Sequence, residues 1–325
     1  MLRLCLKEYK GMNRTRKVLV IRSGAMGDFI VTLPVIHLLR KRYSSWWLGI
    51  VARNRVRSLV NNVADEFLDI DGPLLVPFFQ EEIDSNCDEY RYLAGFDLVI
   101  SYLGARGKVS ENLRALGKTR VINADALPPE NYGRHITQFL LEPLAGVLDV
   151  SDTFSPPVPT VSIDEARARQ AEKFLSACGI APSSRVVAVH PGSGGRRKVS
   201  PARNFCRAVN WILARFPDAK VLVIQGEADQ QDVFALERCL KTTAVRVRKE
   251  NLLEVAAILS RASLFMGNDS GIAHLAAAVG APSIVLFRAS DPVLWAPGGE
   301  NVWVATDSSL QEIVQAHAKM ALEFS

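Results

Sequence analysis

The chain has little cysteine and no long uninterrupted apolar stretch. Its five cysteines among 325 residues are odd in number and far apart, and no C-x-x-C pair occurs. We therefore expect neither a disulfide framework nor a zinc finger, and the pattern suits a reducing compartment. No apolar run reaches the ~18–20 residues needed to cross a bilayer. Arg3 and Lys7 interrupt the first apolar residues, which argues against a signal peptide and predicts a cytoplasmic protein.

Several common binding and catalytic motifs are also missing. There is no G-x-G-x-x-G fingerprint, no P-loop, no G-x-S-x-G elbow and no H-x-x-x-H spacing, so dinucleotide, serine-hydrolase and zinc-peptidase chemistry are not indicated. We expect neither a metal nor a cofactor. Asp69 and Asp71 have the spacing of a metal-binding carboxylate pair, but Gly72 and Pro73 follow directly and favour a strand that ends in a turn.

The composition is that of a soluble globular protein. Apolar residues make up 48% and charged residues 22%, which excludes disordered and collagen-like chains. At about 150 residues per domain, the length predicts two domains. The formal net charge is +5. This mild excess fits anionic ligands or an anionic membrane surface and does not require nucleic acid as a partner.

Buried apolar runs alternate with amphipathic segments through both halves of the chain. The first half predicts strands at 18–21, 47–51, 97–101 and 120–123, with a helix over 29–42. The second half predicts strands at 185–190, 220–225, 263–266 and 282–287, and helices over 201–215, 229–240, 252–261, 271–279 and 310–324. Strands that alternate with helices form parallel, doubly wound sheets. The predicted fold class is therefore α/β, with two Rossmann-like domains.

A proline-rich segment at 155–159 separates the two halves, and a capping box at 162–165 opens a helix that Gly179 ends. We place the boundaries as follows: a basic tail over 1–16, the first domain over 17–155, a linker and connecting helix over 156–184, the second domain over 185–308, and a closing helix over 309–325. The tail is interpreted either as a frayed end or as a peripheral membrane anchor.

Ligands of parallel sheets bind at the carboxyl ends of the strands, so the loops after strands are the candidate sites. The first loop contains Gly24 and Gly27 and leads to Asp28 at the start of a helix. A helix-capping aspartate is one interpretation of Asp28, and a general base is the other.

The loop from Pro191 to Lys198 combines glycines, a serine and three cations. Its backbone N–H groups, the Ser193 hydroxyl and Gly194 suit a phosphate, with Lys198 as a point charge. A solvated basic loop is the alternative interpretation.

A third loop contains Asp269, Ser270 and Gly271, where a helix begins, and His274 follows one turn later. A helix start with Ser and Gly is an anion site, although a histidine in this position is also compatible with a satisfied core residue. Elsewhere, Arg106, Lys108 and Arg114 crowd a short basic stretch. They form either a solvated helix face or a contact for an anionic acceptor.

Three segments in this order resemble glycosyltransferase family 9, typified by the ADP-heptose:lipopolysaccharide heptosyltransferases. They are VLVIRSGAMGDFIVTLPVIHLLRKRY at 18–43, VAVHPGSGGRRKVSPARNF at 187–205, and FMGNDSGIAHLAAAVGAPSIVLFRASDPVLWAPGG at 265–299. The resemblance spans about residues 17–325. It implies a GT-B fold with two Rossmann-like domains facing a cleft, a last helix that can cross back to the first domain, and inverting sugar transfer without a metal.

The resemblance also implies roles for single residues. Asp28 matches the family's catalytic base, and Lys198 matches a lysine that contacts the donor diphosphate. Ser270 and Gly271 match the helix start that faces the phosphates. The remaining matches are Asp269 near the donor sugar hydroxyls, His274 in the family's D-[ST]-G-x-x-H pattern, and Asp229 or Glu227 at the ribose.

Two loops depart from the family's pattern. Where members often have K-x-W-P, this chain has Lys198 followed by Val199, Ser200 and Pro201. Where they have F-G-P-T-D-P, it has Phe287-Arg288-Ala289-Ser290-Asp291-Pro292, so that Arg288 stands at a position where glycine is common. These departures leave the identity of the donor and the acceptor open.

The predicted function is therefore transfer of a sugar, heptose first, from an ADP-sugar to an anionic lipid-linked or core saccharide. We expect a monomer in the cytoplasm that can contact the inner face of the membrane. Two alternatives remain on the same fold: a nucleotide-sugar 2-epimerase and a non-catalytic nucleotide-sugar binding protein.

Overall fold

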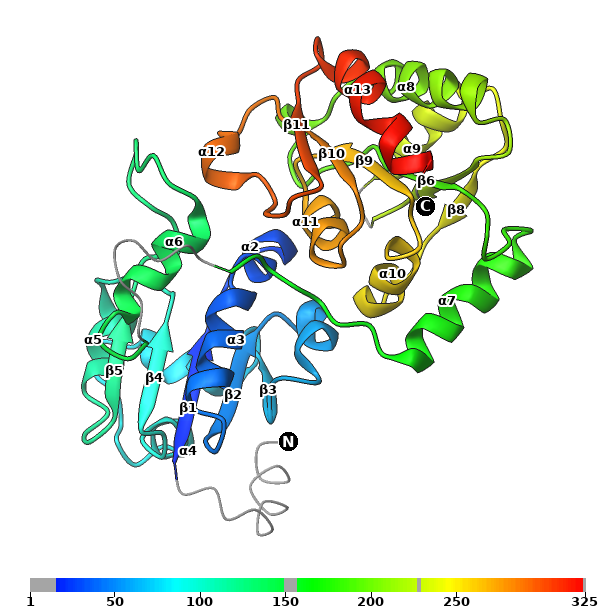
Figure 1. The fold of residues 1–325 in the computed structure, drawn as a ribbon. Helices are drawn as coiled ribbons and strands as arrows, with labels where there is room; N and C mark the ends of the chain where they lie inside the picture. The colour runs from blue at the N-terminus through cyan, green and yellow to red at the C-terminus, as the bar shows by residue number, and fades with distance from the viewer. Residues whose placement is uncertain (1–15, 149–156, 227–228, 324–325) are drawn as a thin grey trace. The chain divides into compact units, whose positions relative to one another are not determined.

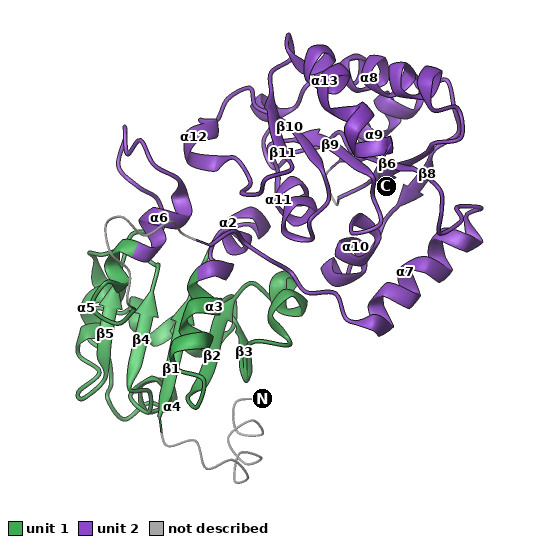
Figure 2. Ribbon diagram, in the orientation of Figure 1, with its two compact units in different colours: residues 1–23, 35–126, 142–151 green, residues 24–34, 127–141, 152–325 purple. Residues whose placement is uncertain are grey.

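The computed structural model describes residues 16–148, 157–226 and 229–323, which form two compact α/β units (Figure 1, Figure 2). Unit 1 contains residues 1–23, 35–126 and 142–151, and unit 2 contains 24–34, 127–141 and 152–325. Two segments that we expected in the first domain, 24–34 and 127–141, thus belong to unit 2. The basic tail, apart from Arg16, and the ribose candidate Glu227 lie outside the described residues.

Unit 1 is built on a parallel sheet of five strands in the order β3-β2-β1-β4-β5. The strands are β1 (Lys17–Ile21), β2 (Trp47–Ala52), β3 (Glu66–Asp69), β4 (Leu98–Ser101) and β5 (Arg120–Asn123). The connecting elements are α3 (Leu33–Arg42), η1 (Asn54–Val60), η2 (Pro73–Phe79), α4 (Asp88–Leu93), α5 (Lys108–Arg114) and η3 (Glu142–Leu144). Continuous β-branched runs form the central strands because both faces of a parallel sheet are covered.

The predicted helix over 29–42 is divided into α2 (Met26–Ile30) and α3. The break lies at Val31 and Thr32, where the Thr32 amide turns to the Phe29 carbonyl and its hydroxyl donates to the Asp28 carbonyl at 2.8 Å. Pro34 explains the break, because proline has no N–H for the ladder and disfavours helical backbone in the residue before it.

Unit 2 contains a parallel sheet of six strands in the order β11-β10-β9-β6-β7-β8. They are β6 (Val186–His190), β7 (Lys220–Ile224), β8 (Val245–Val247), β9 (Leu264–Asn268), β10 (Ser283–Leu286) and β11 (Val302–Ala305). The helices of this unit are α2, α6 (Ile136–Leu141), α7 (Glu165–Ala177), η4 (Arg196–Lys198), α8 (Ala202–Arg215), α9 (Gln230–Glu237), α10 (Leu252–Leu259), α11 (Gly271–Ala278), α12 (Pro292–Trp295) and α13 (Leu310–Glu323).

Helices α8 and α13 share a core with the sheet of unit 2. The buried positions of α8 include Phe205, Ala208, Val209 and Ile212, a spacing that places them on one face of a helix. The resemblance implies a last helix that can cross back to the first domain, and this stays a prediction. Within unit 2, α13 packs on α8, β9, β10 and β11, and its buried residues join the same cluster as Phe205.

The structure corrects one expectation about cysteine. Cys206 of α8 and Cys239, just after α9, form a disulfide with Cα atoms 5.9 Å apart, although their 33-residue separation carries no recognisable motif. Among the described residues, Cys87 and Cys178 are free. No helix in residues 16–148, 157–226 or 229–323 is long and apolar enough to span a membrane.

Candidate functional site

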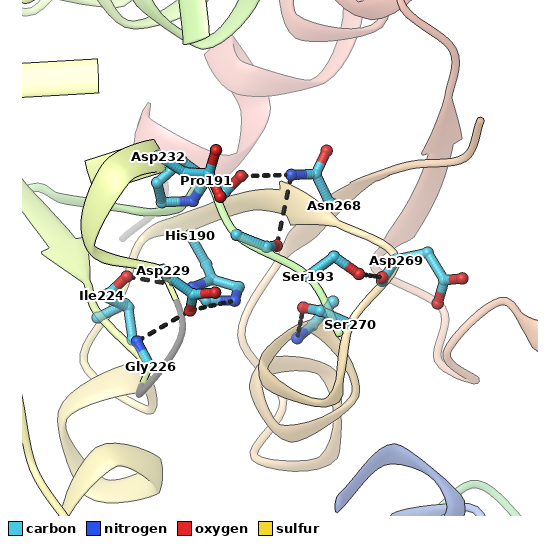
Figure 3. Close-up of polar contacts among 12 residues, drawn as sticks. His190, Pro191, Ser193, Ile224, Gly226, Asp229, Asp232, Asn268, Asp269 and Ser270 are labelled. Atoms are coloured by element: carbon cyan, nitrogen blue, oxygen red, sulfur yellow. Dashed lines mark hydrogen bonds and ion pairs between the residues drawn. The ribbon is translucent and has the colours of Figure 1, made fainter. Parts of the chain in front are cut away.

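The strand order of unit 2 reverses between β6 and β9. From β6 the chain proceeds outward through β7 to β8, and from β9 it proceeds the other way through β10 to β11. Such a switch point, at the carboxyl ends of the two strands, is where open α/β sheets bind ligands. The loop 191–198 follows β6, and the loop from Asp269 to Ser270 follows β9 (Figure 3). The two phosphate loops predicted from the sequence therefore meet at this point.

Helix α11 begins at this switch point. The Ser270 hydroxyl accepts the Ala273 amide at 3.3 Å and caps the helix. Gly271 permits a close approach of α2, because a Cβ there would lie 3.0 Å from the Gly27 nitrogen. Asp28 is the next residue along α2, so the structure brings the candidate base beside the candidate anion site.

Asp28 occupies the third position of α2, and its Oδ2 accepts the Ala25 amide at 2.7 Å. It therefore satisfies the helix terminus without being the N-cap itself. This hydrogen bond fixes the orientation of the carboxylate. A role as a base and a role in capping are compatible here, because a carboxylate has two oxygens with about four acceptor sites.

Lys198 and Asp269 form the charged centre of the site. The Lys198 Nζ lies 2.7 Å from Asp269 Oδ2, and the Ser290 hydroxyl donates to the same oxygen. The Ser193 hydroxyl donates to the Asp269 carbonyl at 2.6 Å, as Figure 3 shows. Asp269 is buried, whereas the Lys198 side chain is 38% exposed. The ammonium is thus held by a buried carboxylate while it stays accessible to a ligand. A Cβ on Gly194 would meet nothing within 4 Å.

His274 is buried, and its Nδ1 has no hydrogen-bond partner among the described residues. Burial lowers the pKa of His274 to about 4, against the opposing charge of Asp269, so the ring is neutral at pH 7. The interpretation as a satisfied core histidine is therefore incomplete, because an unpaired buried nitrogen has a free-energy cost.

Asp229, a candidate ribose ligand, is buried and already has polar partners within the protein. Its Oδ2 accepts the Gly226 amide at 3.0 Å and lies 3.5 Å from Nε2 of His190. Nδ1 of His190 lies 3.1 Å from the Ile224 carbonyl, and burial lowers the pKa of His190 despite Asp229. Figure 3 shows these contacts. Asp229 thus joins the end of β6 to the loop after β7, and its role at a ribose stays a prediction.

Three residues near the site were given no role from the sequence, although His190 and Asn268 begin the two predicted loops. His135, the third, acts electrostatically on His274. His190 is the last residue of β6, and Asn268 the last of β9, so position at a strand end was an available signal. His135 offered no local signal: its Nε2 lies 2.9 Å from the Ala296 carbonyl, 161 residues away. The Thr137 amide donates to its Nδ1 at 3.2 Å, and burial lowers the pKa of His135.

The acceptor candidates belong to unit 1, at or near α5. Lys108 pairs with Glu81 at 3.2 Å, and Arg114 donates to the Ala105 carbonyl at 2.6 Å. Arg106 precedes α5 and accepts the Ser110 hydroxyl through its carbonyl. The cluster around Lys198 in unit 2 contains none of the three, and their acceptor role stays a prediction.

The sequence pair Asp69 and Asp71 forms a turn, as expected. Asp69 ends β3, its Oδ1 accepts the Asp71 amide at 3.2 Å, and its carbonyl accepts the Gly72 amide. Within the part of the chain that the structure describes, no three His, Cys, Asp or Glu side chains are grouped to hold a metal ion.

Solved structures share this fold. A family 9 glycosyltransferase from Veillonella parvula superposes with a TM-score of 0.77 at 20% identity, covering 95% of this chain and 98% of that one. The ADP-heptose lipopolysaccharide heptosyltransferase II of Escherichia coli gives 0.73 at 14% identity, covering 94% and 99%. At these identities the likeness shows the fold, which is the two-unit Rossmann-like arrangement of the GT-B class.

Curated sequences are similar over shorter stretches. Lipopolysaccharide heptosyltransferase 3 of Escherichia coli K12 is 29% identical over 177 residues, 53% of this chain and 49% of that protein. Lipopolysaccharide heptosyltransferase 1 of Campylobacter coli is 28% identical over 108 residues, 32% of each. The matches thus span less than half the length of these relatives. The model of glycosyltransferase family 9 (heptosyltransferase) matches residues 134–321, which hold the switch point, Lys198 and the α11 start; the chain belongs to this family.

Proposed function

We propose that this chain is an inverting, metal-independent glycosyltransferase. It moves a sugar, heptose first, from an ADP-sugar to a lipopolysaccharide-core or other surface saccharide. Family membership supports sugar transfer, and the relatives named as heptosyltransferases support the donor. The observation that supports the proposal is the packing of α2 on α11. A Cβ on Gly271 would lie 3.0 Å from the Gly27 nitrogen, and Gly27 directly precedes Asp28.

In the proposed reaction, Asp28 takes the proton of an acceptor hydroxyl as its oxygen bonds to the anomeric carbon. The bond from that carbon to the diphosphate oxygen breaks, and ADP leaves with the bonding electrons. Lys198 and the N–H groups at Ser270 and Gly271 stabilise the negative charge that develops on the diphosphate. Asp269 releases Lys198 to the phosphates and keeps the Ser290 hydroxyl as a donor.

The remaining assignments are part of the same proposal. Ser193 and Gly194 line the phosphate loop, Asp229 or Glu227 binds the ribose, and His274 and Asp269 face the donor sugar. Unit 1 binds an anionic acceptor through its basic stretch. The net charge of +5 supports contact with an anionic membrane surface from the cytoplasm.

The decisive test of the base is Asp28→Asn. The amide keeps an oxygen for the Ala25 amide, so α2 stays capped, but it cannot accept the proton. Because general-base catalysis contributes about 10²–10⁴-fold, kcat for ADP release should fall by that factor with ADP affinity retained. Asp164→Ala is the control, because Asp164 caps α7 through the Arg167 amide at 2.8 Å. Turnover near wild type in Asp28→Asn would refute the assignment.

The donor is identified by thermal shift with a panel of nucleotide diphosphate sugars at equal concentration, since a ligand that binds the folded state stabilises it by an amount that rises with the logarithm of its affinity. ADP-heptose should give the largest shift and should release ADP only when an acceptor is added. Consumption of a nucleotide sugar without any acceptor would indicate an isomerase. Binding without ADP release for any acceptor would indicate a binding protein.

A further inference from the structure

The two loops that depart from the family's sequence pattern contact each other. Arg288, in the loop after β10, donates from Nη1 to the Val199 carbonyl at 2.5 Å. Its Nε lies 2.8 Å from Oδ2 of Asp307. Val199 directly follows Lys198. The guanidinium is therefore hydrogen-bonded to the peptide group between Val199 and Ser200, one residue beyond the lysine of the site.

Asp307 connects Arg288 to Ser200, in the segment where the chain departs from the K-x-W-P pattern. Its Oδ1 accepts the Ser200 hydroxyl and the Asn204 amide nitrogen at 3.1 Å. Ser200 is buried, and its backbone amide donates to Asn268 at 3.0 Å. The segment after Lys198 is thus held at Val199 and at Ser200 by side chains from three distant parts of the chain.

Asp269 restrains the ammonium end of Lys198, but the backbone of this residue lies in a short 3₁₀ turn, η4, that has few restraints of its own. Its amide donates to the Gly195 carbonyl at 3.0 Å, and no residue of η4 is buried. The side chain has four flexible methylene groups and is 38% exposed. Holding the ammonium in one place for a ligand costs conformational entropy of the backbone and the side chain. If the backbone after Lys198 is already fixed, less of this entropy remains to be lost on binding.

We propose that Arg288 is a positioning residue for Lys198: by bonding Val199 and Asp307 it holds the backbone after Lys198 so that the ammonium is ready for the donor diphosphate. This inference rests on the proposed function, because it assumes that Lys198 binds the diphosphate. Arginine is suited to this position because its planar guanidinium can hydrogen-bond the Val199 carbonyl and the Asp307 carboxylate at the same time, which the single ammonium of a lysine does less well. The chain can therefore keep the site without the tryptophan of the K-x-W-P pattern.

The experiment is a double-mutant cycle read by ADP binding in calorimetry. Arg288→Ala should raise the Kd for ADP about three- to tenfold, the range expected when one rotamer-rich side chain must be ordered on binding. In the Lys198→Ala background the same change should alter the Kd by less than about twofold, the usual error of additivity. The KM for the acceptor should not change.

Two further variants separate positioning from loss of structure. Arg288→Lys retains the charge but can bond only one of the two partners, so the Kd should lie between wild type and Arg288→Ala. The control is Arg246→Ala. Arg246 lies on the edge strand β8, is 36% exposed, and forms an ion pair with Glu237 of α9, so this variant also removes an arginine–carboxylate pair. The Kd should then equal that of wild type.

Equal weakening by Arg288→Ala with and without Lys198 would overturn the proposal, as would an unchanged Kd. A Kd unchanged by Lys198→Ala would instead overturn the diphosphate role of Lys198, and with it the proposed function of the pocket. The failures of the two proposals are therefore distinct.

Discussion

Asn268 is a buried amide whose loss has a calculable effect. It is fully buried at the end of β9. Its Nδ2 donates to the Pro191 carbonyl at 2.6 Å, and its Oδ1 accepts the Ser200 amide at 3.0 Å. Asn268→Ala leaves both backbone groups without a partner. Since each unpaired buried polar group costs about 1–3 kcal/mol, the free energy of unfolding should fall by about 2–6 kcal/mol, a large part of the stability of a typical domain.

Asn268→Asp tests the direction of the two hydrogen bonds. The aspartate keeps an acceptor for Ser200, but it donates to Pro191 only when protonated. Burial raises the pKa of a carboxyl group in the folded state. The folded protein then binds more protons than the unfolded one, so stability falls as pH rises from the unfolded value of ~3.9 through the folded pKa. The variant should be much less stable than wild type at pH 7 and approach it near pH 4.

Urea unfolding followed by tryptophan fluorescence measures both effects, with variant and wild type compared at pH 7 and at pH 4. The control is Asn251→Ala. Asn251 caps α10 through the Leu253 amide at 2.9 Å and is only partly buried, so its loss should cost about 1 kcal/mol. If Asn268→Ala costs no more than Asn251→Ala, the bridge between the two loops does not stabilise the protein and the argument fails.

Three further predictions concern unit 2. The disulfide between Cys206 and Cys239 closes a 33-residue loop, so its reduction should lower the unfolding free energy by about 4 kcal/mol; dithiothreitol should have no such effect on Cys206→Ala. A Cβ on Gly192 would lie 2.1 Å from Asp229 Cγ, so Gly192→Ala should destabilise by about 1–3 kcal/mol, and Asp229→Ala should relieve the clash in the double variant. The folded pKa of His274 is about 4, so its contribution to stability is lost as pH falls from ~6.5 to 4, by up to about 3 kcal/mol; His274→Leu should lack this part of the acid sensitivity in urea titrations.

The central strands and the loops that follow them could be predicted from sequence because their signals are local. Runs such as Val186–His190 are buried on both faces, and glycine, serine and lysine after them predict a phosphate loop. The short strands β8 and β11 were not predicted, and β3 was indicated only by the strand-to-turn pattern at Asp69. At least half of the residues in each are incompletely buried, since an edge strand needs no continuous apolar run.

The sequence by itself determined the α/β class and the carboxyl-end loops, and it named Asp28, Lys198 and Ser270 as candidates, because each depends on a pattern within a few residues. Only the tertiary structure decided which loops meet. The contacts from Lys198 to Asp269 and from Arg288 to Val199 join residues 71 and 89 positions apart, and the assignment of residues 24–34 to unit 2 depends on the approach of Gly27 to Gly271. Such contacts follow from strand order and packing, which no local pattern encodes.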